Sequence, residues 1–272
     1  MSVADFRKIL VVKRYSENTL KVYLSVVQLA EVHFKKQLFD VSEAELHQFF
    51  YHMIHTKGIS VSYQKQIAMA LKLYYQLVHD KAIHLEFLMP ERKSEKLPVI
   101  LSFEEIKRLL KAVNNLKHKC MIALNYSAGL RIGEMIKMRI NDIDSSRMMI
   151  HIKSAKGQKD RMVPLSSKLL KMLRAYYKIY APKDYLFEGQ SGMAYSPSSF
   201  NQMLKKASKK AKIRKQFSSH ALRHSYATHL LENGMDVRVI QKLLGHNSIK
   251  TTMIYTQVAK STLANVKSPL DY

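Results

Sequence analysis

The sequence predicts a mainly α-helical protein of two domains, with one small antiparallel β-sheet in the second domain. Three observations support this prediction. Apolar residues recur at helical spacing through most of the 272 residues, capping residues mark the starts of several helices, and a charged segment with two prolines divides the chain. Hydrophobic residues make up 47% of the sequence, which is enough to build a packed core.

Four helices are predicted in the first domain, residues 1–88. They cover residues 3–12, 16–38, 42–58 and 62–78. Ser42 and Glu45 have the spacing of a capping box, in which each side chain accepts a hydrogen bond from the other residue's backbone N–H. Gly58 is suited to end the same helix. Four amphipathic helices are enough for a small bundle.

Residues 89–99 are predicted to be an extended linker, because they contain Pro90, Pro98 and several charges. The second domain, residues 100–272, begins with another capping box, Ser102 with Glu105. A further helix is predicted to end near Gly129.

The sheet is predicted as a hairpin. The β-rich runs at 147–153 and 161–165 flank "SAKGQKD", with the turn at Lys156 and Gly157, and "NDID" at 141–144 is predicted to be a turn before the hairpin. From Ser166 onward the pattern is helical again.

The charge of the chain favours a polyanionic partner. Lys and Arg number 45 against 21 acidic residues, a formal net charge of +24, and residues 100–272 hold 31 of the basic and 11 of the acidic residues. No Asp or Glu occurs between Gly189 and Leu231, while residues 205–215 hold seven bases. The distribution favours nucleic acid.

Several other classes of protein are disfavoured. The N-terminus lacks the apolar core of a signal peptide, and no apolar run is long enough to span a membrane. Cys120 is the only cysteine, so neither a disulfide framework nor a cysteine-based metal site is expected. These features predict a cytoplasmic protein that acts without a membrane.

The stretch "HALRH" at 220–224 allows two interpretations. Histidines at i and i+4 share a helix face and could bind zinc, but the metalloprotease pattern needs Glu where this chain has Ala221. No nearby carboxylate offers an obvious third ligand. His220 and Arg223 also lie one turn apart at a helix start, where a phosphate is favoured.

Three further segments carry polar residues on an apolar frame. Arg131 follows Gly129, and Glu134 is one turn later, where it can hold the guanidinium. His246 is predicted in the turn after a helix, and Tyr255 on the next helix. A single tyrosine in such a position is more often a core residue.

Taken together, these motifs resemble a known family. "GLRIGEM", "SAKGQKDRMVPL", "HALRHSYATHLL" and "LLGHNSIKTTMIYTQ" occur in the order found in the tyrosine recombinases, the phage-integrase-like family, and most resemble its Xer-type and integron-type members. The steps from His220 through Arg223 and His246 to Tyr255 also look like the family's own. The resemblance implies a SAM-like core-binding domain at 1–88 and a catalytic domain at 100–272.

The resemblance also implies the roles of individual residues. Arg131 and Arg223 would clamp the non-bridging oxygens of a phosphodiester. His220 would donate to the same oxygens or accept the proton of the nucleophile, and His246 would be a further phosphate donor. Tyr255 would attack phosphorus, leaving a 3′-phosphotyrosyl bond and a free 5′-hydroxyl.

The leaving oxygen needs a proton, and Lys156 matches the family's general acid, although Lys159 is a neighbour of the same type. Because the covalent intermediate conserves the bond energy, no ATP is required. Cationic side chains take the place of metal ions, so neither a metal nor a cofactor is expected.

The resemblance therefore implies a site-specific DNA recombinase. Its expected partner is double-stranded DNA with a short inverted-repeat core site, on which it would form a homo-tetramer, or a hetero-tetramer with a paralogue, and a Holliday junction. Two alternatives remain: a type IB topoisomerase-like relaxing enzyme and a non-catalytic, sequence-specific DNA-binding protein. The tail at 259–272 is expected to dock either on its own domain or on a neighbouring subunit.

Overall fold

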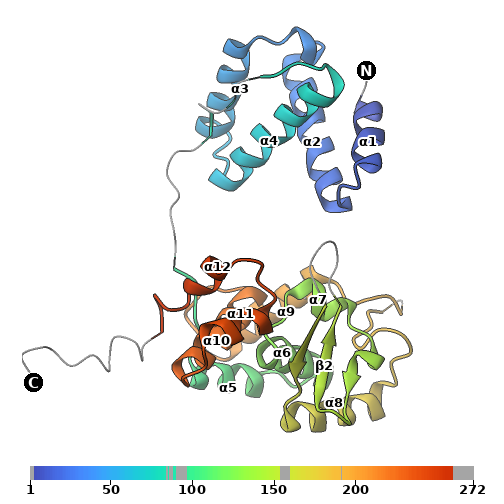
Figure 1. Ribbon diagram of the computed structural model, residues 1–272, viewed down its shortest axis with the longest axis vertical. Coiled ribbons are helices and arrows are strands. Elements are labelled where there is room, and N and C mark those ends of the chain that lie inside the picture. Colours follow the sequence, from blue (N-terminus) through green and yellow to red (C-terminus); the bar gives the residue numbers. More distant parts are fainter. Residues whose placement is uncertain are drawn as a thin grey trace, which may run out of the picture. The chain divides into compact units, whose positions relative to one another are not determined.

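The computed structural model describes residues 3–83, 85, 88–89, 97–153, 160–190 and 192–259. The chain divides into two compact units, Met1–Glu95 and Lys96–Tyr272 (Figure 1). The predictions for the hairpin turn, for Lys156 and Lys159, and for the tail from residue 260 onward lie outside the described residues.

The described residues of unit 1 form a bundle of four α-helices, as predicted. They are α1 (Val3–Val12), α2 (Glu17–Phe34), α3 (Glu43–His55) and α4 (Val61–Val78), with a short 3-10 helix η1 (Leu38–Asp40) between α2 and α3. Both hydrogen bonds of the capping box between Ser42 and Glu45 are present at the start of α3. Helix α2 ends four residues before the predicted position, because Lys35 adopts a left-handed conformation with φ of 54°.

Unit 2 is mostly helical. Its helices are α5 (Phe103–Ala112), α6 (Leu116–Ser127), α7 (Ile132–Lys137), α8 (Ser167–Tyr180), α9 (Pro197–Lys210), α10 (Ser219–Glu232), α11 (Val237–Leu244) and α12 (Ile249–Met253). Helix α6 lies in the middle of the unit and packs against both α8 and α10 (Figure 1). It is buried continuously from Cys120 to Asn125, as expected of a helix surrounded by others.

The sheet has three antiparallel strands in the order β1 (Ile143–Asp144), β2 (Met149–Ile152) and β3 (Arg161–Pro164). The two strands of the predicted hairpin are confirmed. The prediction that residues 141–144 form only a turn was wrong. A 3-10 helix, η3 (Ile140–Asp142), is followed directly by β1, whose two residues pair with β2. A strand this short has no periodicity that a sequence pattern can reveal.

A small second core supports the region of the candidate residues. It contains Tyr226 and Ala227 of α10, Ile240 and Leu244 of α11, and Tyr255. Helices α10, α11 and α12 therefore form one packed group, to which β3 is joined through α11. Within the described residues, no helix is both long and apolar enough to cross a membrane.

Candidate active site

Five of the six candidate residues are described, and all five belong to unit 2. They are Arg131 at the start of α7, His220 and Arg223 on α10, His246 in the turn after α11, and Tyr255 in the turns after α12. The sixth, Lys156, lies outside the described residues.

The start of α7 positions Arg131 beside Glu134. Gly129 ends the preceding segment with φ of +59°, and a Cβ atom there would lie 2.4 Å from the Tyr226 ring, so both the conformation and the space require glycine. The backbone N–H of Arg131 donates to Glu134 Oε2 at 2.8 Å, and its Nη1 donates to Oε1 at 3.0 Å. Glu134 thus caps the helix and holds the guanidinium, as predicted from their spacing.

Arg223 connects the segments that carry the other candidates. Its side chain is buried on α10, where Nη1 donates to the carbonyl of Gly129 and Nη2 to that of Leu244, both at 2.7 Å. Burial, and then the nearby Arg131, lower the pKa of Arg223 to about 10, so the guanidinium remains charged at neutral pH. The planar guanidinium of Arg223 thereby holds the loop before Arg131 and the turn before His246 together.

A third arginine, Arg161, completes the buried charge cluster. Its Nη1 and Nη2 form a bidentate pair with Glu134, both bonds at 2.8 Å, and its Nε donates to the carbonyl of Leu243 at 2.8 Å. Gly245 packs against its stem, since a Cβ at that position would lie 3.1 Å from Arg161 Cδ. Sequence reasoning missed this residue, although it lies two positions before the buried Val163 on β3 and so shares the inward face of the strand.

The cluster holds an excess of positive charge. One carboxylate, Glu134, faces three guanidinium groups, with the Arg223 Nη1 at 3.9 Å from its Oε2. Burial would raise the pKa of Glu134, but the hydrogen bond and charge of Arg161, with smaller contributions from Arg131 and Arg223, outweigh burial and lower it. Positive charge that exceeds the negative charge in a buried position favours an anionic ligand.

Replacing Arg161 with methionine is expected to lower the free energy of unfolding of unit 2 by about 3–5 kcal/mol, because it removes one partner of a buried ion pair. The side chains of Arg161 and Glu134 are only 7% and 9% exposed, so water cannot replace the lost bonds. Urea unfolding measures the change. Arg147→Met, at a side chain that is 82% exposed, is the matched control and should change stability by less than about 0.5 kcal/mol. Equal effects of the two substitutions would contradict the structural role of Arg161.

His246 lies against the same cluster. Its Nδ1 is 2.9 Å from the Thr252 hydroxyl, and its backbone carbonyl accepts a hydrogen bond from Gln241 at 3.0 Å. Burial first, then the charges of Arg223 and Arg131, lower the pKa of His246 to about 4. The ring is therefore neutral at pH 7, and its other nitrogen can donate to a phosphate.

Acidification is expected to destabilise unit 2, with His246 as one cause. Its pKa is about 4 in the folded protein and near 6.5 when unperturbed. Between those values the unfolded state binds more protons, so the free energy of unfolding falls as the pH is lowered through this window. Urea midpoints at pH 7 and pH 5 should differ less for His246→Asn than for the wild type. An identical pH dependence in the two proteins would show that His246 contributes nothing.

Tyr255 is buried and does not lie on a helix. Helix α12 ends at Met253, and residues 254–258 form successive turns, in which the Tyr255 N–H donates to the carbonyl of Thr252. The prediction that Tyr255 lies on the helix was therefore wrong. The side chain is 2% exposed, and its ring stacks on His246 with centroids 6.4 Å apart. Burial raises the pKa of its hydroxyl, while Arg223 and Arg131 act in the opposite direction.

The hydrogen-bond partner of the Tyr255 hydroxyl, among the described residues, is His224 rather than His220. His224 Nδ1 lies 3.1 Å from the hydroxyl oxygen. His220 is exposed at the start of α10, with its ring 6.5 Å from that of His224. From the sequence, the only role suggested for His224 is that of a possible zinc ligand.

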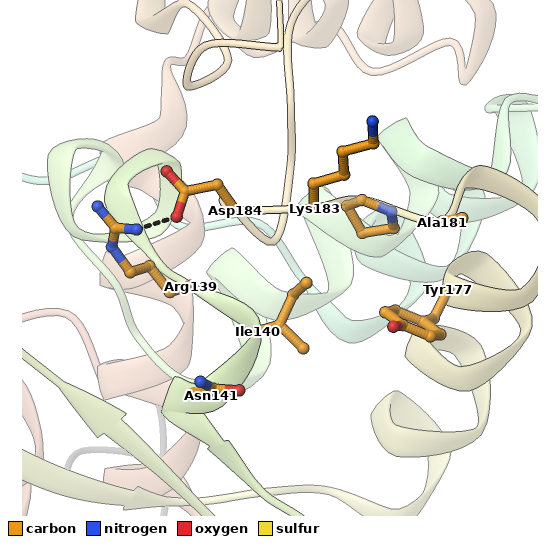
Figure 2. Close-up of a pocket in the computed structure, with 8 residues that line it drawn as sticks. Arg139, Ile140, Asn141, Tyr177, Ala181, Lys183 and Asp184 are labelled. Carbon is orange, nitrogen blue, oxygen red and sulfur yellow. Dashed lines mark hydrogen bonds and ion pairs between the residues drawn. The ribbon is translucent and has the colours of Figure 1, made fainter.

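The described part of the chain holds no group of three or more His, Cys, Asp or Glu side chains that could bind a metal ion. The zinc interpretation of "HALRH" therefore has no third ligand there. A pocket with a volume of about 550 Å³ lies in another part of unit 2. It is lined by Tyr177 and by residues 139–141 and 181–184 (Figure 2). Arg139 and Asp184 are bonded to each other there. The pocket contains none of the six candidate residues.

Each of the two units is similar in sequence to known proteins. Residues 100–262 match the phage integrase family, and residues 3–85 match the phage integrase N-terminal SAM-like domain. Among solved structures, the crystal structure of XerA recombinase is 30% identical, covers 96% of this chain and 95% of its own, and has a TM-score of 0.58. XerH site-specific recombinase bound to a palindromic difH substrate has a TM-score of 0.78 over the whole of this chain and 85% of its own, at 23% identity, and so supports the fold.

Sequence alignments with related proteins cover most of this chain. A putative integrase/recombinase of Sinorhizobium fredii, y4qK, is 36% identical over 96% of this chain and 85% of its own length. Tyrosine recombinase XerD of Oceanobacillus iheyensis is 33% identical over 97% and 96% of the two chains. With both units matched in order and the arginine cluster in place, the chain belongs to the phage integrase family of tyrosine recombinases.

Proposed function

We propose that this protein is a site-specific DNA recombinase that cuts and rejoins DNA strands through a covalent bond to Tyr255. The observation that carries the proposal is the buried cluster in which Arg131, Arg161 and Arg223 surround Glu134, with Tyr255 close enough for Arg223 and Arg131 to affect its pKa. A phosphodiester supplies the negative charge that this cluster lacks.

The chemistry follows from the residue types. Arg131 and Arg223 stabilise the charge that develops on the non-bridging oxygens, and His220 and His246 add donors to them. Tyr255 attacks phosphorus, and the 3′-phosphotyrosyl bond conserves the energy of the broken phosphodiester. We assign protonation of the leaving 5′ oxygen to Lys156. This reaction needs neither ATP nor a metal ion.

The basic helix α9 and the segment after it form the proposed DNA surface. All seven lysines and arginines between residues 205 and 215 are exposed, and four of them line one pocket, together with Ser208 and Asn201. Such a surface can bind DNA by neutralising its phosphates, without contacts to the bases.

DNA binding is expected to weaken by about 10³–10⁵-fold between 50 and 200 mM salt, if about six to ten phosphates are neutralised. A gel-shift titration on duplex DNA measures this slope. Reversing the charge at Lys205 and Lys209, both exposed, should lower the slope by about two counterions. A salt-independent affinity would exclude the basic surface as the DNA contact.

Known relatives suggest the form of the assembly. XerH was solved bound to a palindromic substrate, and lambda integrase as a dimer bound to a core site. We infer that this chain binds a short inverted-repeat core site and acts as a tetramer, of one chain or of two paralogues, through a Holliday junction. The reaction takes place on DNA in the cytoplasm.

The target sequence can be found by trapping. Nicked DNA fragments, from which a short cleaved strand diffuses away, prevent rejoining and leave the protein attached. Sequencing the attached fragments should yield one recurring inverted-repeat site. A type IB topoisomerase would instead relax supercoiled plasmids that lack such a site, and a non-catalytic binding protein would form no attached product. Either result would overturn the proposal.

A further inference from the structure

We propose that His224 accepts the proton of Tyr255 as the tyrosine attacks the phosphodiester. This inference rests on the proposed recombinase function. The resemblance left this role open to His220, and the geometry points to the other histidine of the "HALRH" stretch.

The two histidines occupy successive turns of one face of α10, at i and i+4. His220 is exposed at the helix start, whereas His224 is partly buried with its Nδ1 at 3.1 Å from the Tyr255 hydroxyl. The rings of His224 and Tyr255 have centroids 5.7 Å apart. A proton acceptor must lie within hydrogen-bond reach of the proton that it takes, and His224 meets this requirement.

The protonation states make Tyr255 the donor of this bond. Burial first, then the neighbouring His220 and Arg223, lower the pKa of His224 to about 4, so its ring is neutral at pH 7. Burial raises the pKa of Tyr255, so its hydroxyl keeps the proton. The hydroxyl therefore donates to the lone pair of Nδ1, and the proton of the ring resides on Nε2.

DNA changes this balance in the direction that the reaction needs. His224 is surrounded by Arg223 and His220 on its own helix, by His246 from the turn after α11, and by Tyr255. A phosphodiester bound to the arginine cluster brings one negative charge, which offsets the positive charge that disfavours imidazolium. The proton affinity of His224 rises when substrate binds, and Tyr255 stays inert in the free protein.

The step is balanced. The Tyr255 oxygen forms a bond to phosphorus, the bond between phosphorus and the 5′ oxygen breaks, and the phenolic proton moves to His224 Nδ1. The 5′ oxygen takes a proton from the general acid that we assign to Lys156. On rejoining, the 5′-hydroxyl attacks phosphorus and gives its proton back to the general acid, and the imidazolium of His224 returns its proton to the tyrosine oxygen as the phosphotyrosyl bond breaks. His220 remains available to donate to the phosphate.

Two substitutions of His224 separate proton transfer from positioning. In His224→Asn the amide oxygen occupies the place of Nδ1 and can accept the hydrogen bond, but it cannot take the proton. His224→Phe can do neither. His220→Asn is the matched control one turn away. Each full-length protein is assayed for single-turnover cleavage of the nicked substrate between pH 4.5 and 9, with DNA affinity measured in parallel.

Wild-type cleavage should rise with pH through an inflection above the free-protein value of about 4, because only neutral His224 can accept a proton. His224→Asn should cleave about 10²–10⁴-fold more slowly, bind DNA as tightly, and lose the inflection. His220→Asn should lose rate but keep the inflection. A substrate with sulfur in place of the 5′ oxygen, whose leaving group needs no proton, should not rescue His224→Asn.

If His224→Asn cleaved at the wild-type rate with the wild-type pH profile, His224 would not be the proton acceptor, although the proposed function would stand. The same conclusion would follow if His220→Asn, rather than His224→Asn, lost the inflection. Full activity of His224→Asn alongside an inactive, folded His224→Phe would assign His224 to positioning only. If the wild type itself formed no covalent product, the proposed function would fail, and this role with it.

Discussion

Replacing Tyr255 with phenylalanine is expected to abolish strand cleavage while leaving DNA affinity nearly unchanged. The substitution removes one oxygen atom, the proposed nucleophile, and keeps the ring that stacks on His246. Among the described residues, the Tyr255 hydroxyl is hydrogen-bonded to His224, and the substitution removes that bond at a cost of about 1 kcal/mol of stability. On the nicked substrate, the wild type should form a product that survives boiling in detergent, and Tyr255→Phe should form none.

Tyr226→Phe provides the control within the same small core. Tyr226 packs beside Gly129 and is almost as buried as Tyr255, so its substitution tests for general disturbance of the site. It should still yield the covalent product. A product formed by Tyr255→Phe, or lost in Tyr226→Phe alone, would show that the nucleophile is wrongly assigned.

Replacing Arg223 with lysine is expected to slow cleavage by about 10²–10³-fold, although the charge is retained. A lysine ammonium cannot reproduce the planar fork that bonds the carbonyls of Gly129 and Leu244 and still face a phosphate. DNA affinity should fall far less, because most phosphate contacts lie elsewhere.

Single-turnover cleavage and gel-shift titration measure the two quantities separately. Arg238→Lys, at an exposed position of α11, is the control and should match the wild type in both. A large loss of affinity with a normal cleavage rate in Arg223→Lys would indicate that Arg223 holds the ground state and has no special role in the transition state.

Local signals in the sequence predicted most of the fold, because helix ends are set by nearby residues. The capping boxes at Ser42 and Ser102 and the left-handed Gly129 just after α6 are local features, and all three occur in the structure. Strand β1 was missed because its two residues gain their structure from pairing with β2. That pairing is a tertiary contact and leaves no pattern in "NDID".

The candidate site was only partly predictable for a similar reason. The resemblance supplied Arg131, Arg223 and Tyr255 by their order along the chain. Arg161 belongs to a strand and meets Glu134 from a distance of 27 residues, so only the fold brings their charges together. His224 lies beside Tyr255 because α12 ends early and the turns that follow bring the hydroxyl back toward α10.

The proposed function requires that Tyr255 become covalently attached to DNA without a metal ion. The most direct test is to form the product on the nicked substrate in EDTA, digest it with trypsin and nuclease, and identify the modified peptide by mass spectrometry. Residues 251–260, "TTMIYTQVAK", form one tryptic peptide with Tyr255 as its single tyrosine. We expect a nucleotide 3′-phosphate on that tyrosine. Attachment to any other residue, attachment through a 5′-phosphate, or a product that appears only when magnesium or zinc is restored would contradict the claim.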